Sequence, residues 1–280
     1  MTSPEHVVLV PLDGSEHAKV ALPVARTWAA LDRASLHIVY VARADAGEEA
    51  SALPARLALG PAEAPHAVVH SRTGDPATAI VELAREYENA TVVLCARTIA
   101  TDLAATAHTA ERVITGAPGP IVFVPQSRGQ RPWEVHKVLV PHDGTPSATH
   151  ALAPVARIVN AANAQVFVLH VATPGGEHRG ETGELTAPRY VDQAQHEWPA
   201  WTDEFLGRLA HGCPVDPTAI TMKVARGAAA TAALGFAAEH AIDLIVLTWY
   251  GGLDERRAAV FKRVLRESPC PVLLLRRDAE

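Results

Sequence analysis

The chain lacks the features that mark secreted, membrane-bound and nucleic-acid-binding proteins. It has three cysteines, Cys95, Cys213 and Cys270, with no C-x-x-C pair, so we expect reduced core thiols rather than a disulfide framework. No apolar run approaches about 18 residues, and the first residues show no basic-then-apolar signal, which predicts a cytoplasmic protein without a membrane span. Lysine and arginine number 25 against 31 acidic residues, and this net charge of −6 argues against a nucleic-acid-binding surface.

The common catalytic signatures are also missing. The sequence contains no G-x-x-x-x-G-K-[ST], G-x-G-x-x-G, H-E-x-x-H or G-x-S-x-G, so kinase-like, dehydrogenase, zincin and α/β-hydrolase sites lack their motifs. The 14 histidines are scattered, and without about four ligands at a recognisable spacing we predict no metal site. The pairs that invite a metal are His66 with His70 on one strand face, His142 with Asp143, and His211 with Cys213. Of these, His142 with Asp143 is kept as an acid–base candidate.

An internal repeat is the strongest positive feature. VLVPLDG at residues 8–14 returns as VLVPHDG at 138–144, and LHIVYV at 36–41 returns as VFVLHV, in each case 130 residues later. GDPATAIVELAREY from Gly74 matches GAAATAALGFAAEH from Gly227, so the second copy carries 23 extra residues. Gene duplication and fusion explain this order. It predicts a first domain at 1–127, a linker at 128–134 and a second domain at 135–280.

Each copy alternates apolar runs with segments of helical period. The runs VVLV, LHIVYV, VVLC and PIVFV, with their counterparts VLV, VFVLHV, LIVL and PVLLL, are typical of strands covered on both faces. AVVHS and TMKV add a weaker strand to each copy, and apolar residues at i, i+3, i+4 and i+7 predict amphipathic helices between them. The expected fold is α/β: two tandem five-stranded parallel sheets with helices on both faces. Pro23 and Pro154 predict a kink in the helix after the first strand of each copy.

The segments PLDGS and PHDGT follow the first strand of each copy. In a doubly wound sheet the ligand crevice lies outside the carboxyl ends of the strands, so Asp13 and Asp143 are predicted to point into such a crevice. Proline ends the strand and glycine permits a tight turn. Ser15 or Thr145 can cap the next helix through its hydroxyl, which is a sufficient reason for its presence, and we assign it no catalytic role.

Together these segments resemble the universal stress protein family over essentially the whole chain. The resemblance rests on V-P-x-D-G-[ST] in both copies, on GDPATAIVELAREY, on DLIVL, and on the ending RVLRESPCPVLLLR. It implies the fold of adenine nucleotide alpha-hydrolase-like proteins. It also implies an intramolecular pseudo-dimer with pseudo-twofold symmetry, in which the last strands, IVFVP at 121–125 and VLLLR at 272–276, pair antiparallel. A further homodimer remains open.

The resemblance further implies an adenine nucleotide as ligand, either ATP or AMP, with Mg²⁺. Many family members bind ATP through nucleoside contacts and a loop of the form G-x-x-G, nine residues, G-[ST]. The candidate nucleotide-binding residues are Pro11, Leu12, Asp13, Val41 and Gly74 in the first copy, and Pro141, His142, Asp143, Val171, Gly227 and Gly251 in the second.

The phosphate loops depart from the family pattern in both copies. In the first, Cys95 and Thr98 stand where glycines are expected and residues 107–108 read Ala-His; in the second, Gly251 is kept but residues 258–259 are both alanine. A Cβ hinders close approach of backbone N–H groups to phosphate oxygens, and lost donors weaken binding further. The sequence therefore predicts weak or absent ATP binding.

These features favour a non-catalytic regulatory or adaptor protein of the stress response. The alternatives are an ATP-binding member with slow ATP hydrolysis, or a pure interaction scaffold. The extra residues of the second copy fall within 172–217, where Trp198, Trp201, Phe205 and Leu209 recur at helical spacing. They predict a helix that covers the sheet or, alternatively, an aromatic patch for a protein partner.

Overall fold

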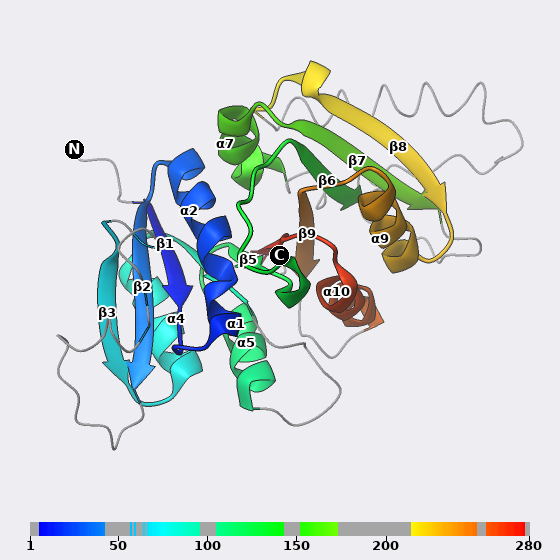
Figure 1. The fold of residues 1–280 in the computed structure, drawn as a ribbon. Helices are drawn as coiled ribbons and strands as arrows, with labels where there is room; N and C mark the ends of the chain where they lie inside the picture. Colours follow the sequence, from blue (N-terminus) through cyan, green and yellow to red (C-terminus); the bar gives the residue numbers. More distant parts are fainter. Residues whose placement is uncertain are drawn as a thin grey trace, which may run out of the picture. The chain divides into compact units, whose positions relative to one another are not determined.

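The computed structural model describes residues 6–42, 57, 59, 64, 66–95, 105–142, 152–172, 214–250 and 256–277, and the chain alternates strands with helices (Figure 1). The elements of the first half are β1 (His6–Pro11), α1 (Glu16–Lys19), α2 (Ala21–Asp32), β2 (Ser35–Ala42), β3 (Val68–Thr73), α4 (Pro76–Glu86), β4 (Asn89–Leu94), α5 (Ala105–Gly116), β5 (Ile121–Phe123) and the 3-10 helix η2 (Gln126–Arg128). Those that follow are β6 (Lys137–His142), α7 (Leu152–Ala162), β7 (Gln165–Ala172), the 3-10 helix η4 (Pro217–Ala219), β8 (Ile220–Arg226), α9 (Ala229–Glu239), β9 (Leu244–Tyr250), α10 (Arg256–Glu267) and β10 (Val272–Arg277).

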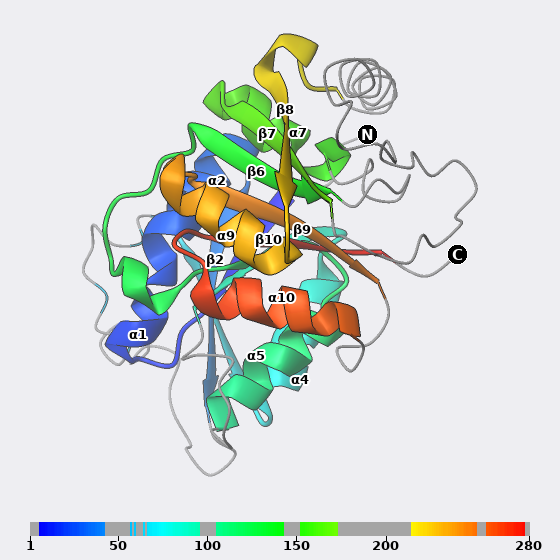
Figure 2. The same cartoon turned by 90° about the vertical axis from the view of Figure 1, so that its right-hand side faces the viewer.

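The chain divides into two compact units that do not coincide with the two repeats. One unit combines residues 1–134 with 249–280, and the other is formed by 135–248. The C-terminal residues join the first unit because β10 runs antiparallel to β5, with Leu273 opposite Val122. Helix α10 faces α5, where Lys262 Nζ lies 4.0 Å from Glu111 Oε1 (Figure 2). The expected antiparallel pairing of the two last strands is thus confirmed.

The first unit contains the predicted parallel sheet. Its strands lie in the order β3-β2-β1-β4-β5-β10, and the first five are parallel. Helix α2 covers one face, and α4 with α5 covers the other (Figure 1). The apolar run of β1 explains its central place, because Val7 to Val10 are at most 1% exposed.

The second unit repeats this arrangement. Its strands lie in the order β9-β6-β7-β8, all parallel, with β6 between β7 and β9. Helix α9 packs on β6, β7 and β8. The α/β fold class predicted from the alternating apolar runs is confirmed in both halves of the chain.

The kink predicted at Pro23 is instead a change of helix. Helix α1 ends at Lys19 and α2 begins at Ala21, so Pro23 lies in the first turn of α2. In the first turn of a helix the backbone N–H has no intrahelical acceptor, so proline breaks no hydrogen bond there. Pro154 lies in α7, which the structure describes from Leu152, and the residues before it are outside the described part, so the kink expected there stays a prediction.

Residues 126–134, between the two repeats, pack against the first half. The ring of Trp133 stacks on that of Trp28, with centroids 6.3 Å apart and 7° between the planes. The carbonyl of Trp133 accepts a hydrogen bond from Thr27 Oγ1 at 2.8 Å. Trp133 is 5% exposed, so this segment belongs to the core of the first unit.

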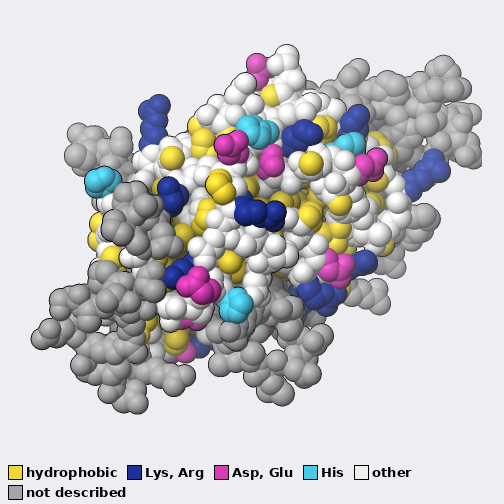
Figure 3. All heavy atoms as spheres, viewed as in Figure 1, with side chains coloured by type: hydrophobic (Ala, Val, Ile, Leu, Met, Phe, Trp, Pro, Cys, Tyr) yellow, Lys and Arg dark blue, Asp and Glu magenta, His cyan; other side chains and the backbone are white. Residues whose placement is uncertain are grey.

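Acidic and basic side chains are interspersed over the described part of the face seen in Figure 3. None of the described helices is long and apolar enough to span a bilayer.

A histidine pair lies between β2 and β3, but it is not the pair considered from the sequence. His66 precedes β3 and has a φ of +62°, so it does not share a strand face with His70. Instead, His70 Nε2 lies 3.0 Å from His37 Nδ1, and His37 Nε2 lies 3.1 Å from Ser35 Oγ. Tyr87 stands edge-on to His37, with centroids 5.2 Å apart. Burial, followed by the charge of Arg72, lowers the pKa of His70.

This histidine pair predicts acid sensitivity. Because the pKa of His70 is lower in the folded state, the unfolded chain binds more protons below its own pKa of about 6.5, and stability falls as the pH falls through that value. His70→Gln keeps a donor for His37 without titrating, so its Tm should fall less than the wild-type Tm between pH 7 and pH 5. The charged groups nearest His70 are Arg72 and Glu86, which also pair with each other at 3.3 Å. Parallel pH–Tm curves for the two proteins would contradict the assignment.

The turn before β5 offers a test of the packing. A Cβ on Gly119 would lie 2.2 Å from the carbonyl oxygen of Ala90, a backbone atom of β4. Because overpacking costs about 1–3 kcal/mol, we expect Gly119→Ala to lower Tm by about 2–10 °C in thermal unfolding. Gly235→Ala is the matched control: nothing lies within 4 Å of its new Cβ, and alanine suits the middle of α9. An unchanged Tm for Gly119→Ala would refute the close approach.

Candidate functional site

A crevice opens at the carboxyl ends of β1, β2 and β4 in the first unit. Its volume is about 280 Å³. The lining residues are Pro11, Leu12, Asp13, Ser15, His17 and Ala18, with Val39, Val41, Pro76, Ile80, Leu94, Cys95, Thr109, Ala110 and Val113. A ligand crevice at this end of a doubly wound sheet is what the strand order predicts. The structure therefore brings together four residues proposed from the sequence: Pro11, Leu12, Asp13 and Val41.

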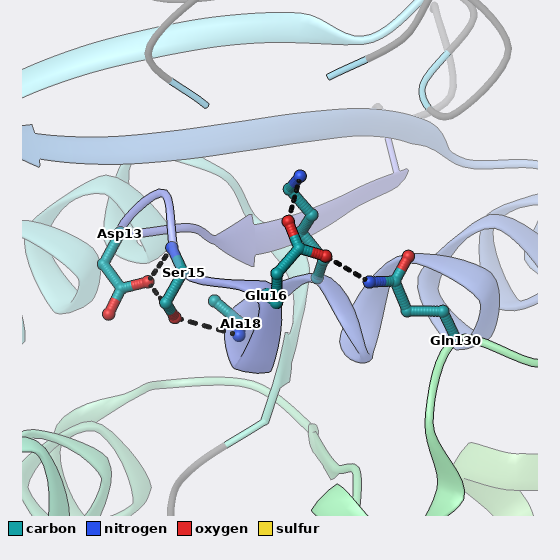
Figure 4. Close-up of polar contacts among 6 residues, drawn as sticks. Asp13, Ser15, Glu16, Ala18 and Gln130 are labelled. Carbon is teal, nitrogen blue, oxygen red and sulfur yellow. Dashed lines mark hydrogen bonds and ion pairs between the residues drawn. The ribbon is translucent and has the colours of Figure 1, made fainter. Parts of the chain in front are cut away.

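Asp13 shapes the turn after β1 (Figure 4). Its Oδ1 accepts hydrogen bonds from the backbone N of Ser15 at 2.9 Å and from Ser15 Oγ at 2.6 Å. Ser15 Oγ in turn accepts from the backbone N of Ala18 at 3.2 Å, which is the predicted cap of α1. Leu12 N donates to the carbonyl of Val39 at 2.9 Å and fixes the turn to β2. The second oxygen of Asp13 has no hydrogen-bond partner among the described residues.

The walls of the crevice are apolar. Val39 and Val41 come from β2, Leu94 from β4, Ile80 from α4 and Val113 from α5. Such a lining with a few polar groups is typical of small-molecule sites, because apolar walls bury the ligand and polar groups orient it. The sequence reasoning missed all of these residues except Val41. Alternation along β2 could have indicated Val39, which points to the same face two residues earlier.

Gly74 does not line the crevice, although it was proposed as a contact. It ends β3 with a φ of +109°, and its N–H donates to the carbonyl of Ala42 at 3.2 Å. That φ favours glycine, and it allows the chain to turn directly into α4, whose Pro76 does line the crevice. Gly227 has a φ of +112° at the matching turn before α9. Both glycines therefore serve the backbone turn.

The second half presents only part of its proposed site. Pro141 and His142 end β6, and Val171 lies near the end of β7, so these residues share the carboxyl edge of the second sheet. His142 is 5% exposed and lies beside His170 on the neighbouring strand, also 5% exposed. Asp143 and Gly251 lie outside the described residues, as do Cys213, His211 and the stretch 173–213, so the acid–base pair of His142 with Asp143 stays a prediction.

Cys95 sits at the end of β4, on the crevice wall. Burial raises the pKa of its thiol to about 11, so the side chain is a neutral thiol at physiological pH. Since the thiolate is the nucleophilic form, this cysteine contributes shape rather than reactivity. By the family resemblance, position 95 is one at which a phosphate loop is expected to have glycine. Thr98, the next departure from that pattern, lies outside the described residues.

Helices α4 and α5 are tied together beside the crevice. Asp75 caps α4 by accepting from Thr78 N at 2.9 Å and from Thr78 Oγ1 at 2.8 Å. Its other oxygen accepts from Arg112 Nη1 of α5 at 2.8 Å, and Arg112 Nη2 donates to Thr78 Oγ1 at 3.0 Å. The bond from Arg112, followed by the two from Thr78, holds the pKa of Asp75 well below its usual range.

The crevice suits a nucleoside better than a metal centre. Apolar walls of this size can enclose a flat base, and the Asp13 carboxylate can accept from ribose hydroxyls. Among the described residues no group of three or more His, Cys, Asp or Glu side chains could hold a metal ion. The described lining therefore combines apolar walls with one carboxylate that can accept hydrogen bonds from a small polar ligand.

The strand order and this crevice define a doubly wound α/β protein with a crevice at the carboxyl ends of its strands. The model of the universal stress protein family matches the chain twice, at residues 6–125 and 134–276. The chain therefore belongs to the universal stress protein family. No curated protein sequence matches it.

Solved structures support the fold. A universal stress protein from Archaeoglobus fulgidus DSM 4304 is 16% identical, with a TM-score of 0.62, and the match covers 97% of this chain and 98% of that one. A functionally unknown protein from Pseudomonas aeruginosa PAO1 is also 16% identical, with a TM-score of 0.65 and coverage of 97% and 92%. At this identity the likeness concerns the fold alone.

The ion pair between Asp75, which caps α4, and Arg112 of α5 can be tested by measuring Tm as the pH is lowered. Asp75→Asn keeps the cap but loses the charge that pairs with Arg112, so we expect Tm at neutral pH and low salt to fall by about 1–3 °C. The folded pKa of Asp75 is depressed, so its contribution is present above the unfolded pKa of about 3.9 and is lost as the pH falls below it. The Tm difference between the two proteins should therefore shrink below pH 4.

Asp216→Asn is the control for this variant. Asp216 makes the same two bonds, to Thr218 N at 2.9 Å and Thr218 Oγ1 at 2.8 Å, but it pairs with no arginine among the described residues. Its replacement should leave the unfolding of the first unit unchanged. A Tm difference for Asp75→Asn that stayed as large at pH 2 as at neutral pH would show that the ion pair is not its source.

Proposed function

We propose that this universal stress protein is a non-catalytic regulatory or adaptor module that binds an adenine nucleotide in the crevice of its first half. The observation that carries the proposal is the crevice itself, in which Pro11, Leu12, Asp13 and Val41 converge. These are the positions at which the family resemblance implies nucleoside contacts. The regulatory output is a change in contacts with a protein partner, for which the sequence offers the aromatic residues Trp198, Trp201 and Phe205.

The ligand that fits best carries few phosphates. A volume of about 280 Å³ lies just below the range for small-molecule pockets, about 300–1,000 Å³. The side chain of Cys95 occupies a glycine position of the phosphate loop, which removes a close approach for backbone donors. Adenosine or AMP should therefore bind at least as tightly as ATP, with or without Mg²⁺.

The alternative function is slow ATP hydrolysis. It would require a general base and an aligned γ-phosphate. Within the described crevice, Cys95 is a neutral thiol and one oxygen of Asp13 is engaged by Ser15. These features favour the regulatory function.

Binding can be measured directly. Nucleotides released from the purified protein by denaturation are identified by mass, and titration calorimetry then compares adenosine, AMP and ATP. Asp13→Asn can still accept from Ser15 but loses the carboxylate, so it should weaken AMP binding by about tenfold or more, because hydrogen bonds to charged groups contribute about 1.5–3 kcal/mol.

The control for Asp13→Asn is Asp216→Asn, in the second half, which should bind AMP as the wild type does. Absence of adenine compounds from both assays would reject the proposal. Stoichiometric ATP with steady phosphate release would support the enzymatic alternative instead.

A further inference from the structure

One residue that lines the crevice, the half-buried His17, is not among the proposed nucleoside contacts and is not repeated in the second half. His17 lies in α1, two residues after Ser15, and its side chain contributes to the crevice lining. The equivalent position in the second repeat, 130 residues later, is Ser147. The imidazole is thus particular to the first half.

A residue outside α1 determines which ring nitrogen of His17 carries the proton. The side-chain amide nitrogen of Gln126 donates a hydrogen bond to His17 Nδ1. A neutral imidazole that accepts at Nδ1 carries its proton at Nε2. Among the described residues nothing bonds to Nε2. His17 therefore offers one N–H donor beside the crevice.

The position of this donor indicates which part of a ligand it meets. Strands β2 and β4 lie on opposite sides of β1, and β5 lies beyond β4. Val39 and Val41 belong to β2 and form an apolar side suited to a base. His17 is bonded to Gln126, three residues beyond the end of β5, so it is fastened to the opposite side. The polar end of a nucleotide whose base lies against β2 would face this side.

We propose that His17 donates its Nε2–H to the phosphate of a bound adenine nucleoside monophosphate, and that Gln126 is the positioning residue that fixes the required tautomer. The inference rests on the proposed function, because it assigns a contact within the same crevice. A donor to a phosphate oxygen forms a charge-assisted hydrogen bond, which is about twice as strong as a neutral one. This hydrogen bond replaces part of the phosphate binding that is lost because Cys95 occupies a glycine position of the phosphate loop.

The test compares AMP with adenosine, because only AMP carries the group that His17 would contact. By titration calorimetry, His17→Ala should weaken AMP binding about tenfold and change adenosine binding less than twofold. His17→Gln, whose amide also donates, should recover part of the loss. Gln126→Ala should weaken AMP binding about two- to tenfold, because the proton is no longer confined to Nε2.

A matched control lies in the same segment. Gln130 Nε2 donates to Glu16 Oε2 at 3.0 Å, again joining residues 126–134 to α1, but Glu16 is absent from the crevice lining (Figure 4). Gln130→Ala should bind AMP as the wild type does. Long-range ¹H–¹⁵N spectra of the histidines should show the Nε2–H tautomer for His17 in the wild type and a mixture in Gln126→Ala. A purely structural role for Gln126 would not produce that change.

The outcomes separate this inference from the proposed function. If the wild type binds neither adenosine nor AMP, the proposed function fails and the inference falls with it. If the wild type binds both and His17→Ala, with a circular dichroism spectrum like the wild type, binds AMP equally well, the inference alone is overturned. A tautomer at His17 other than Nε2–H would also overturn it.

Discussion

The burial of β1 between β2 and β4 is the constraint on which the crevice depends. Val7 to Val10 are at most 1% exposed, and β1 pairs with β2 on one edge and with β4 on the other. The chain therefore leaves β1 toward β2 and returns on the far side through β4. Because the connections after β1 and β4 lead away in opposite directions, a crevice is left outside the carboxyl ends of these two strands.

Much of this fold could be predicted from the sequence, because strands buried on both faces must be apolar throughout. The sequence did not predict the structure where contacts between residues distant in the chain decide it. The repeat assigns residues 249–280 to the second copy, yet pairing of β10 with β5 places them in the first compact unit. His66 fell outside β3 because its φ of +62° marks a turn, and no periodic pattern reveals a backbone angle. Pro23 was taken for a kink, although proline also suits the first turn of a helix.

For the candidate site, the rule about strand ends indicated Asp13, and the family resemblance added Pro11, Leu12 and Val41, all of which line the crevice. Residues contributed by helices were not predictable in this way. Ile80 and Val113 line the crevice only because α4 and α5 pack at particular rotations on the sheet, and His17 has no sequence signal at all. Gly74 illustrates a different limit: the motif marks it correctly, but its φ of +109° assigns it to the turn that directs Pro76 toward the crevice.

The two repeats differ at the positions that tie α4 to α5. Asp75 corresponds to Ala228, and that residue precedes α9 without a side-chain cap. Arg112 corresponds to Arg263, which bonds within its own helix to Glu267 at 3.1 Å. The carboxylate that ties the two helices in the first half is thus replaced by alanine at the matching position of the second. Since Pro76 and Val113, the neighbours of Asp75 and Arg112, line the crevice, the tie fixes one wall of it. For the proposed nucleotide site, a wall held in place before binding loses less conformational entropy when the ligand arrives, which supports the proposal that the site lies in the first half.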